Sequence, residues 1–232
     1  MLEGLRRRWL WRRLRDRSYE FLFEADPAAE LVSIDCETTS LDVGQAELLS
    51  VAAIKVRGNR ILTSQSLELV VRSQVAPSPQ NIIVHQLRPL DVERGVAVDE
   101  AIERLLGFIG GRALLGYYLE FDVAVLNKYI RPRLGIPLPN RQIEVSALYY
   151  DAKSRHLPPG SHIDLRFATI CRELDLPEHA AHDPFNDALL AAMIYVRLAG
   201  PSPKLGRSGQ VPRPSRADSG AIAPRPGDPE AL

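Results

Sequence analysis

The sequence lacks the features of membrane and secreted proteins. No stretch of its 232 residues approaches the ~18 consecutive apolar residues of a membrane span. Its basic N-terminal stretch is not followed by the apolar core of roughly 7 to 15 residues that secretory signals contain. In a chain with 45% hydrophobic and 25% charged residues, these absences predict an ordinary globular protein of the cytoplasm.

Cysteine is also scarce. The two cysteines are Cys36, within an apolar strand pattern, and Cys171, within a helical one. Neither has a partner at C-x-x-C spacing, which excludes the usual zinc and dithiol redox motifs. We therefore expect both to be buried thiols.

The formal net charge is zero, but the charges are unevenly distributed. Residues 1–17 contain seven arginines against Glu3 and Asp16, a surplus of five positive charges, so the rest of the chain has a surplus of five negative charges. A basic N-terminal segment thus precedes a mildly acidic body, and any attraction for a polyanion must be local to that segment.

The basic segment has the periodicity of an amphipathic helix. Leu2, Leu5 and Trp9 recur at helical spacing, and Leu10 and Leu14 form a neighbouring stripe. Three interpretations remain open. The helix docks on the body with its arginines in solvent, or it contacts a phosphate backbone, or it serves a membrane surface or targeting.

The composition of the C-terminal end differs from that of the middle. Residues 200–232 include seven prolines and five glycines, with no aromatic residue and no apolar period. Such a segment cannot bury enough surface to offset its ordering entropy, so we predict disorder. The predicted parts are a basic helical arm at 1–27, a folded domain at 28–199 and a disordered tail at 200–232.

The middle of the chain alternates between strand and helix periodicity. Strands are expected at 31–35, 48–56 and 60–71, with a turn at Gly58-Asn59, and shorter ones at 113–117 and 142–149. Helices are expected at 98–109, 120–134, 165–174 and 184–198. Strands first, followed by alternating helices and strands, indicate an α/β domain with a mixed five-stranded sheet flanked by helices.

The first strand ends in two acids, Asp35 and Glu37, which are followed by Thr38 and Thr39. Because side chains alternate faces along a strand, both carboxylates point the same way. Two like charges this close are unfavourable unless a cation, a shared proton or water relieves them. Taken alone, the pair is also explained by solvated acids at a strand end, and the threonines by a turn.

Two further clusters place acids near helix starts. Asp122 shares a helical stripe with Leu126, where an acid needs an explanation, and the helix dipole supplies one without any function. His182 precedes a helix that Asp183 can cap and in which Asp187 falls one turn inside. A capping or core histidine is the alternative there. Four acids and one histidine are thus expected at strand ends and helix starts, where α/β folds usually place their sites.

In order and spacing, these motifs resemble the DEDDh family of 3′-to-5′ exonucleases, which includes the proofreading epsilon subunit of bacterial DNA polymerase III, ribonuclease T and oligoribonuclease. The family's D-x-E-T-T-x-L motif is similar to residues 35–41, its F-D motif to 121–122 and its H-x4-D motif to 182–187. The segment I-I-V-H-Q-L at 82–87 is similar to the family's H-x-I/L segment. The resemblance covers roughly 28–198, so the predicted folded domain at 28–199 would be the exonuclease domain.

The resemblance implies a ribonuclease H-like fold and metal-dependent hydrolysis of nucleic acid from a free 3′ end. The implied ligands of two divalent ions, Mg²⁺ or Mn²⁺, are Asp35, Glu37, Asp122 and Asp187. Oxygen ligands suit these ions, and two of them can activate a water and stabilise the leaving 3′ oxygen. His182 would be the general base that takes a proton from the attacking water. The terminal nucleotide would lie against Thr38, Thr39, Leu41 and His85.

The chain departs from the family pattern before the second motif. Many relatives have H-N where this chain has Tyr117-Tyr118, which puts an asparagine contact in doubt. We assign Tyr118 to substrate binding because its ring can stack on a base, with a core tyrosine as the alternative. Glu120 is an additional acid without an assigned role.

The favoured function is a 3′-to-5′ exonuclease that acts on single-stranded DNA in repair, proofreading or nucleic-acid turnover. It explains all four acids and the histidine, whereas an inert nucleic-acid-binding or scaffolding protein explains only the fold. An RNA-directed exoribonuclease would use the same site. A polymerase or repair protein is a conceivable partner, although the tail lacks the glutamine, aliphatic and aromatic pattern of clamp-binding segments.

Overall fold

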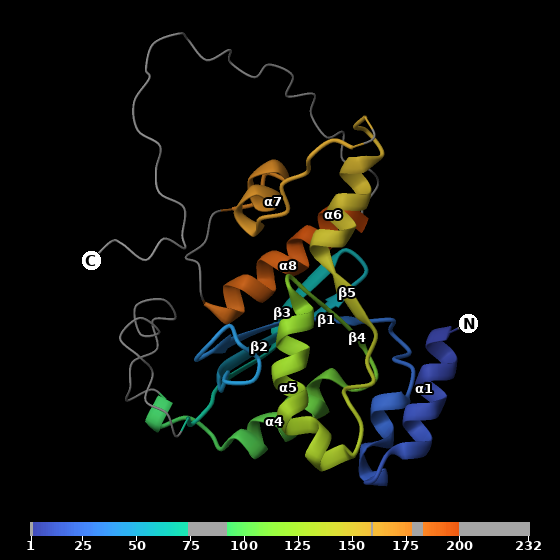
Figure 1. Ribbon diagram of the computed structural model, residues 1–232, viewed down its shortest axis with the longest axis vertical. Coiled ribbons are helices and arrows are strands. Elements are labelled where there is room, and N and C mark those ends of the chain that lie inside the picture. Colours follow the sequence, from blue (N-terminus) through green and yellow to red (C-terminus); the bar gives the residue numbers. More distant parts are fainter. Residues whose placement is uncertain (1, 74–91, 159, 178–182, 200–232) are drawn as a thin grey trace.

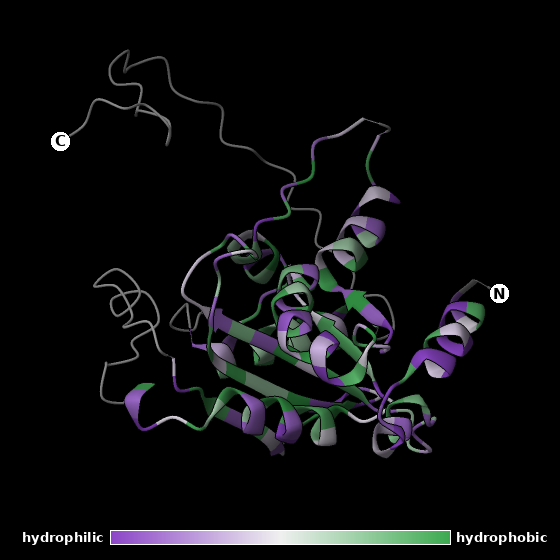
Figure 2. Ribbon diagram, turned by 60° about the horizontal axis from the view of Figure 1, so that its bottom comes forward, coloured by the Kyte–Doolittle hydropathy of each residue, from purple (hydrophilic) through white to green (hydrophobic). Residues whose placement is uncertain are grey.

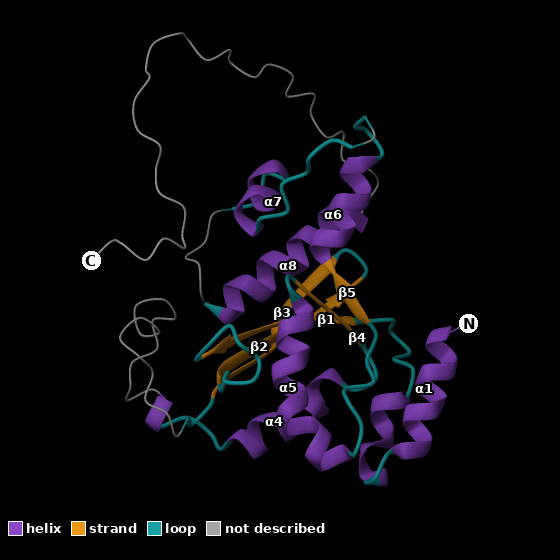
Figure 3. Ribbon diagram, in the orientation of Figure 1, coloured by secondary structure: helices purple, strands orange, loops and turns teal. Residues whose placement is uncertain are grey.

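The protein is a three-layer α/β structure. The computed structural model describes residues 2–73, 92–158, 160–177 and 183–199. A single five-stranded sheet has the order β3-β2-β1-β4-β5, and helices cover both of its faces (Figure 1, Figure 3). This confirms the predicted mixed sheet and matches the ribonuclease H-like fold.

The sheet combines an antiparallel half with a parallel half. Its strands are β1 (Leu31–Thr38), β2 (Leu48–Arg57), β3 (Arg60–Val70), β4 (Ala113–Gly116) and β5 (Gln142–Glu144). Strands β1 to β3 form the predicted antiparallel meander, and Gly58 turns between the last two with a φ of 59°. β4 is parallel to β1, and β5 is parallel to β4. β1 therefore lies in the middle of the sheet.

The helices belong to two hydrophobic cores on opposite faces of the sheet. One core contains side chains of α4 (Val98–Ile109) and α5 (Leu119–Leu134). The other contains side chains of α6 (Val145–Ser154), α7 (Phe167–Glu173) and α8 (Pro184–Ala199). Cys36 belongs to the first core and Cys171 to the second, so both cysteines are buried as predicted.

The N-terminal segment packs on the first of these cores. Helix α1 (Leu2–Arg13) is followed by a 3₁₀ helix, η1 (Arg17–Phe23). Leu10, Leu14 and Leu22 are buried among the side chains of α4 and α5. The Arg15 N–H donates a 2.9 Å hydrogen bond to the carbonyl of Leu134 at the end of α5. Docking on the body, one of the three interpretations left open, is therefore observed.

The strand predicted at 142–149 is wrong beyond Glu144, where the chain becomes α6. The Glu144 carboxylate accepts hydrogen bonds from the Ser146 N–H at 3.1 Å and the Ser146 hydroxyl at 2.8 Å, which caps the new helix. Val145 and Tyr149 are four residues apart and both are buried, so one helical face packs on the core. Capping and packing together override the strand propensity of this segment.

The described part of the chain contains no helix long and apolar enough to cross a bilayer.

Candidate metal and catalytic site

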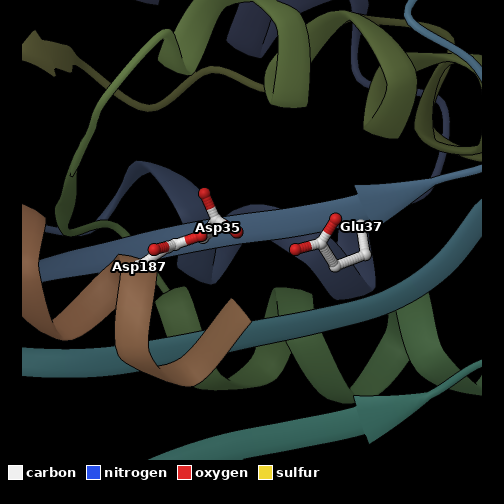
Figure 4. A group of neighbouring side chains, drawn as sticks. All are labelled: Asp35, Glu37 and Asp187. Atoms are coloured by element: carbon white, nitrogen blue, oxygen red, sulfur yellow. The ribbon is translucent and has the colours of Figure 1, made fainter. Parts of the chain in front are cut away.

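Three carboxylates from opposite ends of the chain converge at the middle of the sheet. Asp35 and Glu37 project from the same side of β1, and Asp187 approaches them from the first turn of α8 (Figure 4). One oxygen atom from each of the three lies within 4.8 Å of the other two. The Asp35 side chain is half-buried and that of Glu37 is buried, so water solvates this concentration of negative charge only partly.

The position of Asp187 follows from how α8 begins and where it docks. The Asp183 carboxylate accepts a 3.0 Å hydrogen bond from the Asn186 N–H, which caps the helix as the sequence predicted. The buried Ser33 hydroxyl on β1 donates a 2.6 Å hydrogen bond to the carbonyl of Ala188. This contact holds the residue next to Asp187 against the strand that bears Asp35.

Asp122, the fourth predicted acid, lies near this group but is not one of the three converging carboxylates. Its side chain is 4% exposed, at the start of α5. Its carboxylate accepts hydrogen bonds from the backbone N–H and the thiol of Cys36, whose side chain points away from the face of Asp35 and Glu37. The thiol was expected only to be buried, and no local signal in the sequence indicates this contact.

Burial and like charge both disfavour the ionised acids. Burial raises the pKa of Asp35 well above its ordinary value, and the charges of Asp122, Asp187 and Glu37 raise it further. Burial also raises the pKa of Asp122, against the opposing effect of its Cys36 hydrogen bonds. A cation is one way to relieve such repulsion while all the carboxylates stay ionised.

The donor set fits a hard divalent cation. Asp35, Glu37 and Asp187 offer only carboxylate oxygens, which suit Mg²⁺ and Mn²⁺ better than softer metals. The group lies at the same strand end and helix start that the sequence indicated. The assignment of these residues as ligands stays a prediction.

The two threonines after Glu37 stabilise the loop that follows β1. The Thr38 hydroxyl donates a 2.9 Å hydrogen bond to the carbonyl of Ser40, and the Thr39 hydroxyl accepts one of 2.9 Å from the Glu47 N–H. The loop presents Leu41, whose side chain is 87% exposed. The threonines therefore do form the turn contacts named as the alternative, and their role in substrate binding stays a prediction.

Lys128 on α5 holds the same loop from the other side, and the sequence did not identify it. Its ammonium donates hydrogen bonds to the carbonyls of Val43 at 2.9 Å, Gly44 at 3.2 Å and Ala46 at 2.7 Å. A lysine in a helical pattern normally indicates a solvated position, and the carbonyls that it binds are more than 80 positions away in sequence.

Tyr118 is an exposed aromatic residue at the start of α5 and not a core tyrosine. Its side chain is 59% exposed, and its φ of 56° and ψ of 31° lie in the left-handed region, where non-glycine residues are uncommon. Its ring stacks on Phe121 with centroids 6.1 Å apart. Tyr117, in contrast, is half-buried and packs on Phe167 at 4.6 Å. The exposed Tyr118 ring is thus available to a ligand.

A surface hollow adjoins Tyr118. It is lined by Tyr118, Leu119, Glu120, Gln142, Glu144 and Ser146. Besides capping α6, Glu144 accepts a 2.9 Å hydrogen bond from the Leu119 N–H and so fixes the start of α5. The contact of Glu144 with α5 had no local sequence signal, because Leu119 lies 25 positions earlier in the chain.

The two histidines predicted for the site, His85 and His182, lie outside the described residues. Their proposed roles in nucleotide binding and as general base stay predictions.

Comparison with known proteins gives consistent matches. The RNase T family model, described as exonuclease, matches residues 32–195. The chain is 25% identical to the DNA polymerase III subunit epsilon of Aquifex aeolicus over 167 residues, which cover 72% of this chain and 79% of that protein. It is 23% identical to a PolC-type DNA polymerase III of Thermotoga petrophila over 193 residues, or 83% of this chain and only 13% of the polymerase.

Two solved nuclease structures are similar in fold. Exonuclease I of E. coli has a TM-score of 0.62 and 13% identity, and the match covers 76% of this chain and 42% of that one. The cell-death related nuclease CRN-4 has a TM-score of 0.61 and 16% identity, and covers 74% of this chain and 64% of that one. At these identities the likeness establishes the fold.

Proposed function

The chain belongs to the RNase T exonuclease family, of the DEDDh type, and from that premise we propose that it removes nucleotides from the 3′ end of single-stranded DNA by metal-dependent hydrolysis. The observation that carries the proposal is the approach of Asp187 to Asp35 and Glu37, because a nuclease of this family requires divalent metal and this group offers the ligands. An inert protein of the same fold would have no need to keep three carboxylates together.

The residues of the chain have separate roles in this proposal. Asp35, Glu37 and Asp187, with Asp122 as the fourth carboxylate beside them, would hold two divalent ions. When bound, Mg²⁺ or Mn²⁺ supplies Lewis-acid chemistry, which activates water and stabilises the charge on the leaving 3′ oxygen. His182 would accept the proton from the attacking water.

Recognition of the 3′-terminal nucleotide would use the loop after β1 and the start of α5. Leu41 offers an exposed apolar side chain, and Tyr118 offers an exposed ring that can stack on a base. Thr38 and Thr39 would shape the pocket between them, with His85 as a further contact. Base stacking tolerates any sequence, so we expect little preference among the four bases.

Two observations favour DNA. Exonuclease I of E. coli has been crystallised with a dA16 oligonucleotide, and the sequence relatives are DNA polymerase III proteins. The relatives also make a polymerase a candidate partner, although the chain spans only 13% of the PolC-type protein. The assay must therefore distinguish cleavage of RNA from cleavage of DNA.

One assay tests the proposal. Purified protein is incubated with 5′-labelled single-stranded DNA, single-stranded RNA of the same sequence, and short oligoribonucleotides, each with Mg²⁺, Mn²⁺ or EDTA. We expect a ladder of 5′-labelled DNA products that shortens with time, needs metal and is blocked by a 3′-terminal phosphorothioate linkage. Because Asp187→Asn is nearly isosteric with the wild type, it serves as the control for contaminating nuclease.

The outcomes separate the alternatives. Stronger cleavage of RNA would assign the protein to the RNA-directed branch of the same chemistry. Release of the labelled 5′ nucleotide first would contradict the polarity. No cleavage of any substrate with either metal, by protein that binds single-stranded DNA, would favour the inert alternative.

A further inference from the structure

Helix α1 has apolar side chains on two faces, and packing explains only one of them. Leu10 and Leu14 are 2% and 4% exposed and join the core, and Arg7 beside them donates a 3.0 Å hydrogen bond to the carbonyl of Leu22. A docked helix needs one such face. Leu5 and Trp9 lie on the other side and are 61% and 52% exposed.

The outer face alternates apolar and cationic side chains. Leu5, Arg8, Trp9 and Arg12 are spaced at i, i+3, i+4 and i+7 and line one shallow hollow. The guanidinium of Arg13 lies over the Trp9 ring, 4.1 Å from its centroid. Figure 2 shows hydrophilic and hydrophobic residues interspersed along α1. We call Leu5, Arg8, Trp9, Arg12 and Arg13 the outer face.

Positive charge is concentrated on this segment. Six of the seven arginines among the first 17 residues are exposed, namely Arg6, Arg8, Arg12, Arg13, Arg15 and Arg17. The acids among these 17 residues are Glu3 and Asp16, and Arg17 also pairs with Glu20 at 2.9 Å. Since the rest of the chain has a surplus of negative charge, this segment is where a polyanion would be attracted.

Two surface hollows that share Gln142 extend from α1 to Tyr118. One hollow lies between α1 and the start of β5, lined by Glu3, Arg6, Asn140, Arg141 and Gln142. Gln142 also lines the hollow beside Tyr118. In Figure 1, α1 lies on the side of the sheet where β5 forms the edge. A strand that leaves Tyr118 along β5 would therefore reach Arg141 and then Arg6 on α1.

We propose that α1 binds the 5′ part of the single-stranded substrate while its 3′ end lies at the carboxylates. The inference rests on the proposed function and adds a second contact region to that site. Arginines would pair with phosphates, and Trp9 would stack on a base, the combination of groups that single-strand binders use. The arrangement favours nucleic acid over a lipid surface, because Arg8 and Arg12 interrupt the apolar stripe that a helix lying in a membrane interface keeps free of charge.

Tryptophan fluorescence tests the contact directly, since Trp9 and Trp11 are the only tryptophans of the chain. In Trp11→Phe, Trp9 is the sole tryptophan, and its emission is excited at wavelengths that tyrosine does not absorb. Titration of this full-length variant in EDTA with single-stranded DNA of about 20 nucleotides should quench its emission as bases stack on the ring. The same titration with vesicles of anionic phospholipid should leave the emission unchanged.

Turnover of long and short substrates tests the consequence for catalysis. A dinucleotide has one phosphodiester, which must lie at the carboxylates, so it has no phosphate left for α1. Arg8→Ala/Arg12→Ala should raise KM for the long strand about tenfold and leave dinucleotide turnover unchanged. The slope of log binding constant against log salt concentration should become shallower by about 1.4, because two phosphate contacts are lost. Arg60→Ala/Arg104→Ala removes two exposed arginines of β3 and α4 and should change none of these.

Each result counts for or against the contact. An unquenched Trp9 with a long strand, or equal effects of the two double variants, would overturn it and leave the nuclease function standing. A blue shift of the Trp9 emission with vesicles, together with no change on addition of DNA, would overturn it in favour of a membrane. Quenching by DNA without hydrolysis of any substrate would support the contact while the nuclease function failed.

Discussion

Asp35 and Asp187 lie side by side, with carboxylate oxygens less than 4.8 Å apart, although one comes from the first strand of the sheet and the other from its last packed helix. The Ser33 hydrogen bond to the Ala188 carbonyl holds the two elements together at this point. The fold thus holds two carboxylates close together although their negative charges repel each other. Such strain in a stable protein is expected where a function compensates for it.

The first prediction concerns removal of one charge from this pair. Asp187→Asn should lose at least about a hundredfold in exonuclease activity, because several kcal/mol of transition-state stabilisation depend on correctly held metal. In EDTA its melting temperature should equal or exceed that of the wild type, since a like-charge contact is removed without a cavity. Asp99→Asn, an exposed acid on α4 that pairs with Arg133 at 3.6 Å, is the control and should keep full activity. More than a tenth of wild-type activity in Asp187→Asn would contradict the assignment.

The second prediction follows from the raised pKa values of Asp35 and Asp122. Between the pKa of about 4 in the unfolded chain and the higher folded pKa, the native state binds more protons than the unfolded state. The free energy of unfolding should therefore fall as pH rises through this window, by up to about 1.4 kcal/mol per pH unit for each group. Denaturant titrations in EDTA from pH 4 to 8 measure this slope.

Metal should change that slope. Ions that bind the ionised carboxylates of the native state compete with the protons, so Mg²⁺ or Mn²⁺ should stabilise the protein most at high pH. Two results would contradict this account: a free energy of unfolding in EDTA that rises with pH across this window, or a stabilisation by metal that does not depend on pH. Either would show that Asp35 and Asp122 do not link protonation to stability and metal binding.

Much of the fold could be predicted because its elements have strong local signals. The helix Val98–Ile109 has the predicted bounds, and the meander of β1 to β3 follows from alternating apolar residues and the turn at Gly58. The prediction failed after Glu144, where a side chain caps the following helix and tertiary packing outweighs strand propensity. A cap of this kind is visible only when the backbone conformation is known.

The acids of the candidate site were predictable from their motifs, whereas the groups that position them were not. The spacing of Asp35 and Glu37 puts them on one face of any strand. Nothing local indicates that Ser33 would bind the Ala188 carbonyl, or that Lys128 would bind the carbonyls of the loop after β1. These contacts join residues far apart in sequence, and a single sequence contains no information on such pairs.

The third prediction is that Lys128 positions the loop that presents Leu41. Lys128→Met should free the Val43, Gly44 and Ala46 carbonyls from their shared donor and allow the loop to move. We expect KM for single-stranded DNA to rise about three- to tenfold while kcat falls less than twofold, because the carboxylates stay in place. Steady-state kinetics on an oligothymidylate give both values.

Lys153→Met is the matched control for this lysine. Lys153 binds the Tyr149 hydroxyl at 2.9 Å and the Glu173 carboxylate, on helices α6 and α7. A general loss of stability should affect both lysine variants alike in thermal melts, whereas only Lys128→Met should raise KM. Equal KM values in the two variants would show that Lys128 stabilises the fold without affecting substrate binding.

The last prediction concerns the general base. A base must be neutral to accept a proton, so turnover at saturating metal should rise with pH through an apparent pKa near the ordinary histidine value of about 6.5. Acids close to the base would raise that pKa and bound cations would lower it, so the midpoint would report the balance between them. His182→Ala should lose about 10² to 10⁴ in rate, the usual contribution of a positioned base, and should also lose the acidic limb of the profile.

Metal binding, measured by thermal shift with Mn²⁺, should be nearly the same in His182→Ala as in the wild type, because the predicted ligands are the carboxylates. His179→Ala removes a histidine three positions before His182 and outside the motif, so it should keep both rate and profile. If His179→Ala is the more damaging variant, or if His182→Ala keeps its rate and its acidic limb, water is activated in another way. The carboxylate site could then be correct while the histidine mechanism is wrong, and the unchanged metal shift would show it.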